Sequence, residues 1–252
     1  MSITIKTIKD IECIRAANKI VASCLDYVES FISPGMSLLE VDKKIDDFIT
    51  NKGAYPAFKG LYGFPNAACL SLNEVCIHGI PDNTILKEGD ILGVDIGSKL
   101  NGYYGDSART FPIGKISKSD EDLIACSKDA LYFAIKNIKS GMHFKELSYL
   151  IENFILSRGY VPLEDFCGHG IGKKPHEEPE IPNYLTSKNP KQGPKIKDGM
   201  VFCIEPMICQ KDGRPVIGAD KWRVTSQDGL KTSHYEHCVA VIGGKAEILS
   251  IA

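Results

Sequence analysis

The strongest constraint on the fold is an internal repeat. Residues 31–49 and 137–155 align without a gap, and the identical residues keep one constant spacing: Ile32, Gly35, Met36, Glu40, Ile45, Phe48 and Ile49 recur as Ile138, Gly141, Met142, Glu146, Ile151, Phe154 and Ile155. Later matches follow in the same order, residues 76–80 with 167–171 and residues 86–95 with 196–205. Chance could explain any one match, but three in the same chain order indicate a duplicated unit.

The first copy of the repeat is predicted to contain two helices joined at a glycine turn. Apolar residues recur with helical spacing from Ile8 to Ile32, and Pro34-Gly35 ends this helix. Ser37 and Glu40 have the spacing of a capping box, so we expect a second helix to begin there.

The second copy is predicted to contain the same pair of helices. Ser119 with Asp122 is expected to begin the first of them, and Ser140-Gly141 to end it. Each half then continues with a His-Gly turn, a strand that ends on a carboxylate, and another strand. We therefore expect an α+β fold in which strands from both halves form an antiparallel sheet covered by helices, with pseudo-two-fold symmetry.

The repeat also bears on domain organisation. The chain has 252 residues, and no Pro- or Ser-rich linker separates the two copies. Residues 1–252 are therefore predicted to form a single domain with two halves, about 1–115 and 116–252. The long polar stretch 182–196 is expected to be a surface loop.

The composition excludes several classes of protein. The formal net charge of -2 gives no sign of a nucleic-acid binder. The nine cysteines are odd in number and form no CxxC pair, which argues against a disulfide framework and a cysteine zinc finger. The first ten residues lack the apolar core of a signal peptide, and no window is apolar enough to cross a bilayer. We expect a cytoplasmic protein with no membrane partner.

Two aspartates occur on a predicted hairpin. Asn101-Gly102 lies between two strand-like runs and is a strong signal for a two-residue turn. Asp95 would then face Ala108, and Asp106 would face Gly97. Because side chains alternate along a strand, Asp95 and Asp106 would be diagonal neighbours on one face, with backbones roughly 7–8 Å apart. Close carboxylates repel unless a cation lies between them, so the pair favours a metal site.

Further candidate ligands lie downstream. His169 has glycines on both sides, and His176 follows in the same glycine- and proline-bounded loop. Glu205 ends an apolar strand, and Glu236 is expected to begin the last strand, Tyr235 to Ile242. Oxygen ligands with one imidazole suit Mn, Fe, Co or Zn, and a pair of such ions suits amide hydrolysis.

Other reactive residues have simpler interpretations. His143 occupies the position of Ser37 in the repeat, so a capping or surface role is expected. We expect His234 and His237 behind the metal ligands or on the surface. Three cysteines are expected to be small buried apolar residues, Cys203, Cys209 and Cys238. No Gly-x-Ser-x-Gly occurs, so a nucleophilic serine or cysteine mechanism has weak support.

Several motifs carry a family resemblance. They are SLNEVCIHGIP (71–81), EGDILGVDIG (88–97), GYYGDSA (102–108), CGHGIGKKPHEEP (167–179), GMVFCIEPM (199–207) and HYEH (234–237). Through them the sequence resembles the type I methionine aminopeptidases, bacterial form, over nearly its whole length. The resemblance implies the duplicated pita-bread fold (creatinase/aminopeptidase-like), in agreement with the repeat.

The resemblance implies a site for two divalent metal ions, Co, Mn, Fe or Zn. Asp95 would bind one ion, and Asp106 and Glu236 would bridge both. His169 and Glu205 would bind the other ion. Glu205 would also orient or deprotonate the attacking water.

The resemblance also implies how the substrate is held. His78 would contact the nitrogen side of the scissile amide, and His176 would stabilise the oxyanion. Phe64, Cys69 and Trp222 match positions of the methionine pocket. Some family members have a tyrosine at the position of Leu61 and an aromatic residue at that of Pro175, so the shape of this pocket is left open.

The activity implied is that of a metalloaminopeptidase, a hydrolase that removes the initiator methionine when the second residue is small. It would use a dinuclear metal-activated water in a single catalytic domain. The implied partners are the N-termini of nascent polypeptides, with the ribosome as a candidate partner and a monomer as the expected state.

Two alternatives remain open. An Xaa-Pro dipeptidase or aminopeptidase would share the fold and ligand set, although such enzymes usually carry an extra N-terminal domain and residues 1–60 hold only the first helices. A non-catalytic binding protein on the same fold would lack ligands, whereas all five ligands and both histidines are present. Release of methionine from a Met-Gly peptide, compared with cleavage of an Ala-Pro peptide, separates these alternatives.

Overall fold

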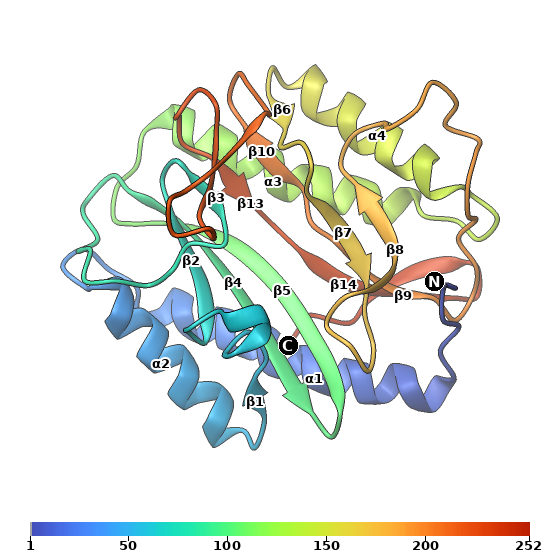
Figure 1. Ribbon diagram of the computed structural model, residues 1–252, viewed down its shortest axis with the longest axis horizontal. Helices are drawn as coiled ribbons and strands as arrows, with labels where there is room; N and C mark the ends of the chain where they lie inside the picture. Colours follow the sequence, from blue (N-terminus) through green and yellow to red (C-terminus); the bar gives the residue numbers. More distant parts are fainter. Residues whose placement is uncertain (1) are drawn as a thin grey trace.

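The structure is a computed structural model and describes residues 2–252. Within these residues the α-helices form the two predicted pairs: α1 (Ile8–Phe31) with α2 (Leu38–Asn51), and α3 (Lys118–Asn137) with α4 (Phe144–Ser157). The pair α1–α2 lies at the bottom of Figure 1 and the pair α3–α4 at the top, with the strands between them. This arrangement gives the molecule the predicted pseudo-two-fold form.

The second helix of each pair begins at equivalent positions of the repeat. Ser37 caps α2 through the predicted capping box: its Oγ accepts from the Glu40 N–H at 3.2 Å, and its own N–H donates to Glu40 Oε2 at 2.7 Å. His143 is the N-cap residue of α4, and its backbone N–H donates to Glu146 Oε2 at 2.8 Å. The capping role expected for His143 is therefore confirmed.

The predicted start of α3 is wrong by two residues. The N-cap is Ser117, whose Oγ accepts from the Asp120 N–H at 3.2 Å, and not Ser119 with Asp122. Both pairs have the spacing of a cap, and the helix uses the earlier one. Asp120 is buried and also pairs with Lys231 at 2.9 Å, so tertiary contacts select this start.

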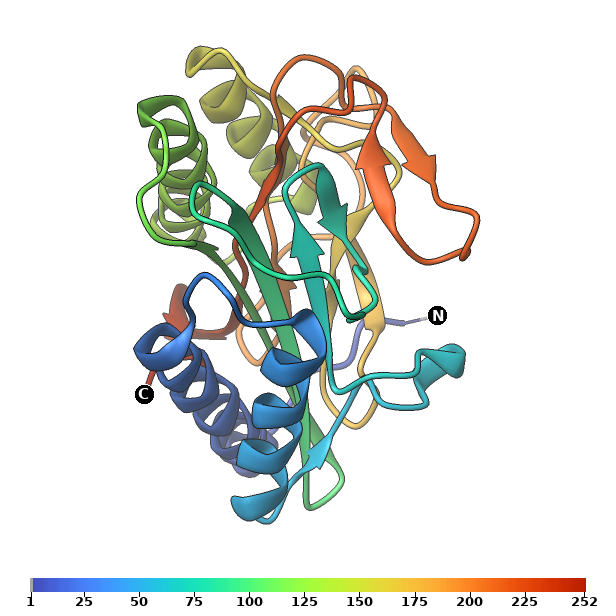
Figure 2. The same ribbon diagram turned by 90° about the vertical axis from the view of Figure 1, so that its left-hand side faces the viewer.

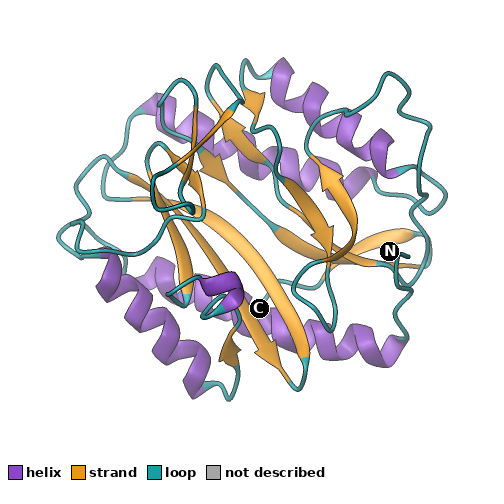
Figure 3. Cartoon of the chain, in the orientation of Figure 1, coloured by secondary structure: helices purple, strands orange, loops and turns teal. Residues whose placement is uncertain are grey.

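The strands form antiparallel sheets of both halves (Figure 3). The first-half sheet contains β1 (Tyr55–Pro56), β4 (Ile91–Leu100) and β2 (Ala68–Leu72) in that order, with β5 (Tyr103–Pro112) paired to β4. The second-half sheet has the order β15 (Lys245–Ile248), β14 (His237–Ile242), β9 (Val201–Ile204), β7 (Cys167–Gly170) and β8 (Glu177–Pro182). Smaller sheets contain β13 (Ser233–His234), β10 (Met207–Cys209) and β6 (Val161–Pro162), and β11 (Pro215–Ile217), β12 (Val224–Ser226) and β3 (Val75–Ile77). A short 3-10 helix, η1, covers Leu61–Gly63.

The β4–β5 hairpin has the predicted register. Asp95 is paired with Ala108 and Asp106 with Gly97. The turn is Asn101-Gly102, whose residues have φ of 50° and 83°, the left-handed values that a tight hairpin turn requires. Both aspartates therefore lie on one face of the hairpin, as expected.

The two halves join along β5. The Ser107 Oγ donates to the Glu236 carbonyl oxygen at 2.6 Å, and the Thr110 Oγ1 donates to the His234 carbonyl oxygen at 2.9 Å.

One hydrophobic core lies between α1, α2 and the first-half strands, and another lies between α3, α4 and the second-half strands. Figure 2 shows the helices on one side of the sheets and the short strands and loops on the other. The predicted pita-bread α+β fold is confirmed.

Two local predictions differ from the structure. The strand expected from Tyr235 begins at His237, so Glu236 lies in the connection between β13 and β14, and β14 is followed by β15. His169 lies inside strand β7 and not in a turn. Glycines at both neighbouring positions suggest a turn in sequence, but here they allow close backbone packing: a Cβ at Gly168 would lie 2.4 Å from the Cys203 carbonyl oxygen.

Two other expectations concern the chain's surface and thiols. The loop predicted over residues 182–196 is irregular and largely exposed from residue 184 to 195, whereas Pro182 ends β8 and both Asn183 and Ile196 are buried. All the cysteines are free thiols. In residues 2–252, no helix combines the length and the apolar character needed to span a bilayer.

Candidate metal centre

A cavity of about 520 Å³ lies where the two halves meet. All the site residues predicted from the sequence line it: Phe64, Cys69, His78, Asp95, Asp106, His169, His176, Glu205, Trp222 and Glu236. Residues far apart in the sequence therefore converge on one space.

The five candidate metal ligands lie in strands of both halves or directly beside such strands. Asp95 and Asp106 project from the hairpin β4–β5 of the first half. His169 comes from β7, Glu205 directly follows β9, and Glu236 directly precedes β14. The site thus depends on the joining of the halves along β5.

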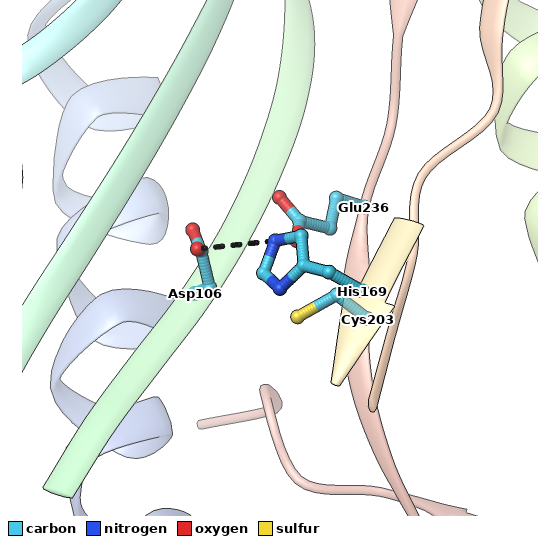
Figure 4. A group of neighbouring side chains, drawn as sticks. All are labelled: Asp106, His169, Cys203 and Glu236. Atoms are coloured by element: carbon cyan, nitrogen blue, oxygen red, sulfur yellow. Dashed lines mark ion pairs between the residues drawn. The ribbon is translucent and has the colours of Figure 1, made fainter. Parts of the chain in front are cut away.

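Three of the five candidate ligands, Asp106, His169 and Glu236, lie close together with the thiol of Cys203. Donor atoms of Asp106, His169, Cys203 and Glu236 are all within 4.8 Å of one another, and Figure 4 shows these side chains pointing into a common space. The His169 Nε2 is 3.9 Å from Asp106 Oδ2 and 3.5 Å from Glu205 Oε1. These separations suit ligands around a cation better than direct hydrogen bonds.

The imidazole of His169 is oriented for metal binding. Its Nδ1 lies 3.0 Å from the Gly170 carbonyl oxygen, which can only accept, so the proton belongs on Nδ1. The Nε2 lone pair then faces the carboxylates. Burial lowers the pKa of His169 to about 3, so the ring is neutral and available as a ligand.

Several carboxylate oxygens in the site have no hydrogen-bond partner within the described chain. They are Asp95 Oδ1, Asp106 Oδ1 and Glu236 Oε1. A buried polar atom without a partner is costly, so these oxygens are suited to contact a positively charged group. A divalent cation fits this donor set, since its ligands would be carboxylates and one imidazole.

The electrostatics of the carboxylates lead to the same conclusion. Burial raises the pKa of Asp95 to about 7 and that of Glu205 to about 8. Burial, and next the neighbouring carboxylates, raise the pKa of Asp106 and Glu236 well above their ordinary values. Without a cation these groups would retain protons near neutral pH, and a bound divalent ion would displace them.

Two histidines lie on the cavity wall beside this cluster. Burial, together with nearby His234 and His176, lowers the pKa of His78 to about 4. His78 has the left-handed φ of 58°, and its ring packs edge to face on Phe166 with centroids 5.8 Å apart. The His176 ring meets the His169 ring edge to face at 4.5 Å, and burial lowers its pKa as well.

One wall of the cavity is apolar. Phe64 and Trp222 pack edge to face, with ring centroids 5.1 Å apart. Phe58 and Cys69 are buried beside them, and Leu61 packs against the same cluster. This wall can bind an unbranched apolar side chain that extends from the metal cluster.

Some residues of the site were not foreseen. Cys203 is buried as expected, yet its thiol lies within the candidate metal cluster. His234 and His237 are buried, so the surface alternative is wrong for both, and the position of His234 behind the candidate ligand Glu205 agrees with the other alternative. His234 Nε2 lies 3.6 Å from Glu205 Oε2, whereas His237 is bonded to Ser250 and Tyr132. His234 and Glu236 are two residues apart. Because side chains alternate along a strand, this spacing could have indicated that both side chains lie on the same face.

Aromatic residues at the mouth were also missed. Tyr62 and Phe166 line the cavity, and Tyr62 stacks on His176 with centroids 6.0 Å apart. Pro175, which raised a question about the pocket, is not among the lining residues.

Comparison with known proteins gives consistent results. Residues 12–242 match the family described as metallopeptidase family M24. A methionine aminopeptidase of Helicobacter pylori is 61% identical over 251 residues, covering 99% of each chain. Methionine aminopeptidase 1 of Bacillus subtilis is 39% identical and covers 97% of this chain and 98% of its own.

Solved structures extend these similarities to the fold. A methionine aminopeptidase of Thermotoga maritima matches with a TM-score of 0.96 at 36% identity, covering 100% of both chains. A prolidase of Pyrococcus furiosus matches with a TM-score of 0.80 at 25% identity, and 65% of its chain is covered. The fold is thus common to both groups, and the similarity is greater to the first.

Proposed function

Since the chain belongs to metallopeptidase family M24 and to its methionine aminopeptidases of the bacterial type I form, we propose that it removes the initiator methionine from nascent proteins whose second residue is small. The observation that carries the proposal is the convergence of five potential ligands beside an apolar pocket. As a member of this family, the chain is a metal-dependent hydrolase.

We propose that the centre holds two divalent ions, Co, Mn, Fe or Zn. Asp95 would bind one ion, while Asp106 and Glu236 would bridge both. His169 and Glu205 would bind the other. The unpartnered oxygens of Asp95, Asp106 and Glu236 support this assignment, because each is buried and belongs to a residue that lines the cavity.

The remaining residues would hold the substrate and move protons. When bound, the ions supply a lowered pKa for water and polarisation of the scissile carbonyl. Glu205 would accept the proton of the attacking water. His176 would donate a hydrogen bond to the carbonyl oxygen as negative charge develops there, and His78 would contact the nitrogen of the same amide. The low pKa of both rings keeps them neutral, each with one N–H to donate.

The apolar wall would select methionine. Phe64, Cys69 and Trp222 line the cavity and would surround an unbranched side chain, and a sulfur atom packs well against aromatic rings. Leu61 would complete the wall on the side of η1. The metal cluster at one end of this pocket would receive the free amine and the scissile bond.

We further propose that the protein acts in the cytoplasm as a monomer, on the N-termini of nascent polypeptides, through a single catalytic domain formed by residues 1–252. The continuity of the two halves along β5 supports the single domain, because the candidate ligands come from both halves.

The test begins with protein stripped by a chelator and reloaded with Mn, Fe or Co. Free methionine is measured from a Met-Gly peptide, with Met-Leu and Ala-Pro peptides alongside. Metal-dependent release from Met-Gly alone supports the proposal. Cleavage of Ala-Pro would indicate a proline-specific peptidase of the same fold. Tight metal binding without cleavage of any peptide would overturn the catalytic roles of His78 and His176.

A further inference from the structure

We propose that Lys6 is a positioning residue for His176. Its ammonium group holds Glu177, and through Glu177 it fixes the loop 172–176 that carries His176 at the edge of the cavity. This inference rests on the proposed function, in which His176 stabilises the carbonyl oxygen of the scissile bond.

The ion pair between Lys6 and Glu177 is buried. The side chains are 7% and 14% exposed, and the Lys6 Nζ donates to Glu177 Oε2. No other pair of a lysine or arginine with a carboxylate in residues 2–252 has both side chains so enclosed. Most surface ion pairs contribute little, whereas a buried pair leaves an uncompensated charge when one partner is removed.

The backbone around Lys6 is fixed on the second half of the molecule. The Lys6 N–H donates to the Gly199 carbonyl oxygen at 2.7 Å. Gly199 has φ of +82°, and a Cβ there would lie 2.7 Å from Ile5 Cγ2, so the segment packs directly on this turn. The turn leads into β9 and then to Glu205. Lys6 therefore contacts Glu177 from a backbone position that is held by the turn at Gly199.

The loop before His176 is organised around the same carboxylate. Glu177 Oε1 accepts from the Lys174 N–H at 3.2 Å, and the Gly172 N–H donates to the Lys174 carbonyl oxygen at 3.2 Å. A Cβ at Gly172 would lie 2.5 Å from Lys6 Nζ and 2.8 Å from Glu177 Oε1. The ion pair thus occupies the space beside Gly172 that a larger side chain would fill, and it packs against the loop.

The position of His176 depends on this arrangement because His176 immediately precedes Glu177. On its other side the ring contacts His169 and the exposed Tyr62. Glu177 also lines the cavity that already contains the carboxylates of the metal cluster. Without Lys6 its charge would be both buried and close to like charges, so Glu177 would move toward water and carry the loop with it.

The consequence is kinetic. A displacement of about 1 Å in a group that acts on the transition state can reduce the rate roughly 100-fold. Lys6→Met removes the charge but keeps an unbranched side chain. We expect kcat on Met-Gly to fall about 10- to 100-fold with KM changed less than about threefold, because His176 acts on the developing oxyanion and not on ground-state binding.

Two further variants separate positioning from stability. Lys6→Arg restores the positive charge and should recover most of kcat. Thr7→Ala is the matched control at the next residue, since Thr7 Oγ1 caps α1 by accepting from the Asp10 N–H at 3.2 Å and does not touch the loop. It should lower thermal stability and leave kcat unchanged.

Hydrogen exchange of the metal-loaded proteins supplies a readout independent of activity. Amides of Gly172 and Lys174 should exchange faster in Lys6→Met than in wild type or Thr7→Ala. If wild type is inactive on Met-Gly, the proposed function fails. If wild type is active and Lys6→Met keeps its kcat, or loses it only in proportion to a stability loss shared by Thr7→Ala, the positioning role is overturned.

Discussion

The backbone N–H of Glu236 donates a hydrogen bond to the carbonyl oxygen of Ala108 at 2.9 Å, which ties a candidate bridging ligand to the strand that carries Asp106. Ala108 is itself the register partner of Asp95. The three carboxylates are therefore placed relative to one another by backbone hydrogen bonds across the join between the halves. Such positioning requires no metal, so the geometry of the centre is built into the fold.

The hydroxyl of Ser107 extends this join and can be removed without altering any ligand. Its Oγ donates to the Glu236 carbonyl oxygen at 2.6 Å in a buried setting. Ser107→Ala should lower the free energy of unfolding by about 1 kcal/mol and weaken metal binding several-fold. Calorimetric titration of the stripped protein with Mn measures the affinity, and a thermal melt measures the stability.

Ser98→Ala is the matched control for this change. Ser98 Oγ donates to the Ala17 carbonyl oxygen at 2.9 Å and is equally buried, and its partner lies in α1 and is not a candidate ligand. It should cost a similar stability but leave the metal affinity unchanged. Equal affinities for Ser107→Ala and wild type would contradict a role of the β5 join in shaping the metal centre.

Removal of metal should make stability strongly dependent on pH. The pKa of Asp95 is raised from 3.8 to about 7 and that of Glu205 from 4.5 to about 8 in the folded, metal-free protein. A raised carboxyl pKa favours folding below the unfolded pKa, and this contribution is lost as pH rises through the folded value. The melting temperature of stripped protein should therefore fall between about pH 4 and pH 8.

The metal-loaded protein provides the comparison, because bound cations replace the protons and stabilise the ionised carboxylates. Its melting temperature should fall less over the same range, so the gain from Mn should increase with pH. Asp95→Asn, which removes one titrating group, should flatten the curve of the stripped protein. Parallel curves with and without metal would show that these carboxylates do not face the cation.

The apolar pocket yields a prediction about substrate recognition. Trp222→Ala removes the ring that packs on Phe64 and opens one wall of the cavity. We expect kcat/KM on Met-Gly to fall about 10- to 100-fold, since losing apolar contact with one side chain costs about 1–3 kcal/mol of transition-state binding. Tyr149→Ala, on an exposed aromatic residue of α4, should change nothing. An unchanged kcat/KM for Trp222→Ala would place the methionine side chain elsewhere.

The sequence predicted those parts of the fold that depend on local and periodic signals. The Asn101-Gly102 turn fixes the register of β4 and β5, so the shared face of Asp95 and Asp106 follows from the residue pattern alone. The repeat likewise predicted the paired helices. These features need only neighbouring residues or a regular period.

Other features depend on contacts that a single sequence does not reveal. The start of α3 at Ser117 follows from the tertiary pairing of Asp120 with Lys231. The thiol of Cys203 enters the metal cluster because its strand β9 lies between β7 and β14, an order that the sequence does not state. The residue pattern named His169, Glu205 and Glu236 as further candidates, but the role of each ligand came from a family resemblance, and strand geometry supported only the aspartate pair.

His176 provides the sharpest test of the division between metal binding and catalysis. Its ring lies on the cavity wall, 4.5 Å from the ring of His169, but it is not part of the cluster of donor atoms. His176→Ala should reduce kcat about 100- to 1,000-fold, as loss of one donor to a developing oxyanion does. Metal affinity and stoichiometry should stay as in wild type, because the ligands are untouched. His143→Ala, at the N-cap of α4 and partly exposed, is the control and should keep full activity. If His176→Ala binds less metal, the residue acts by supporting His169, and a direct role on the scissile carbonyl is refuted.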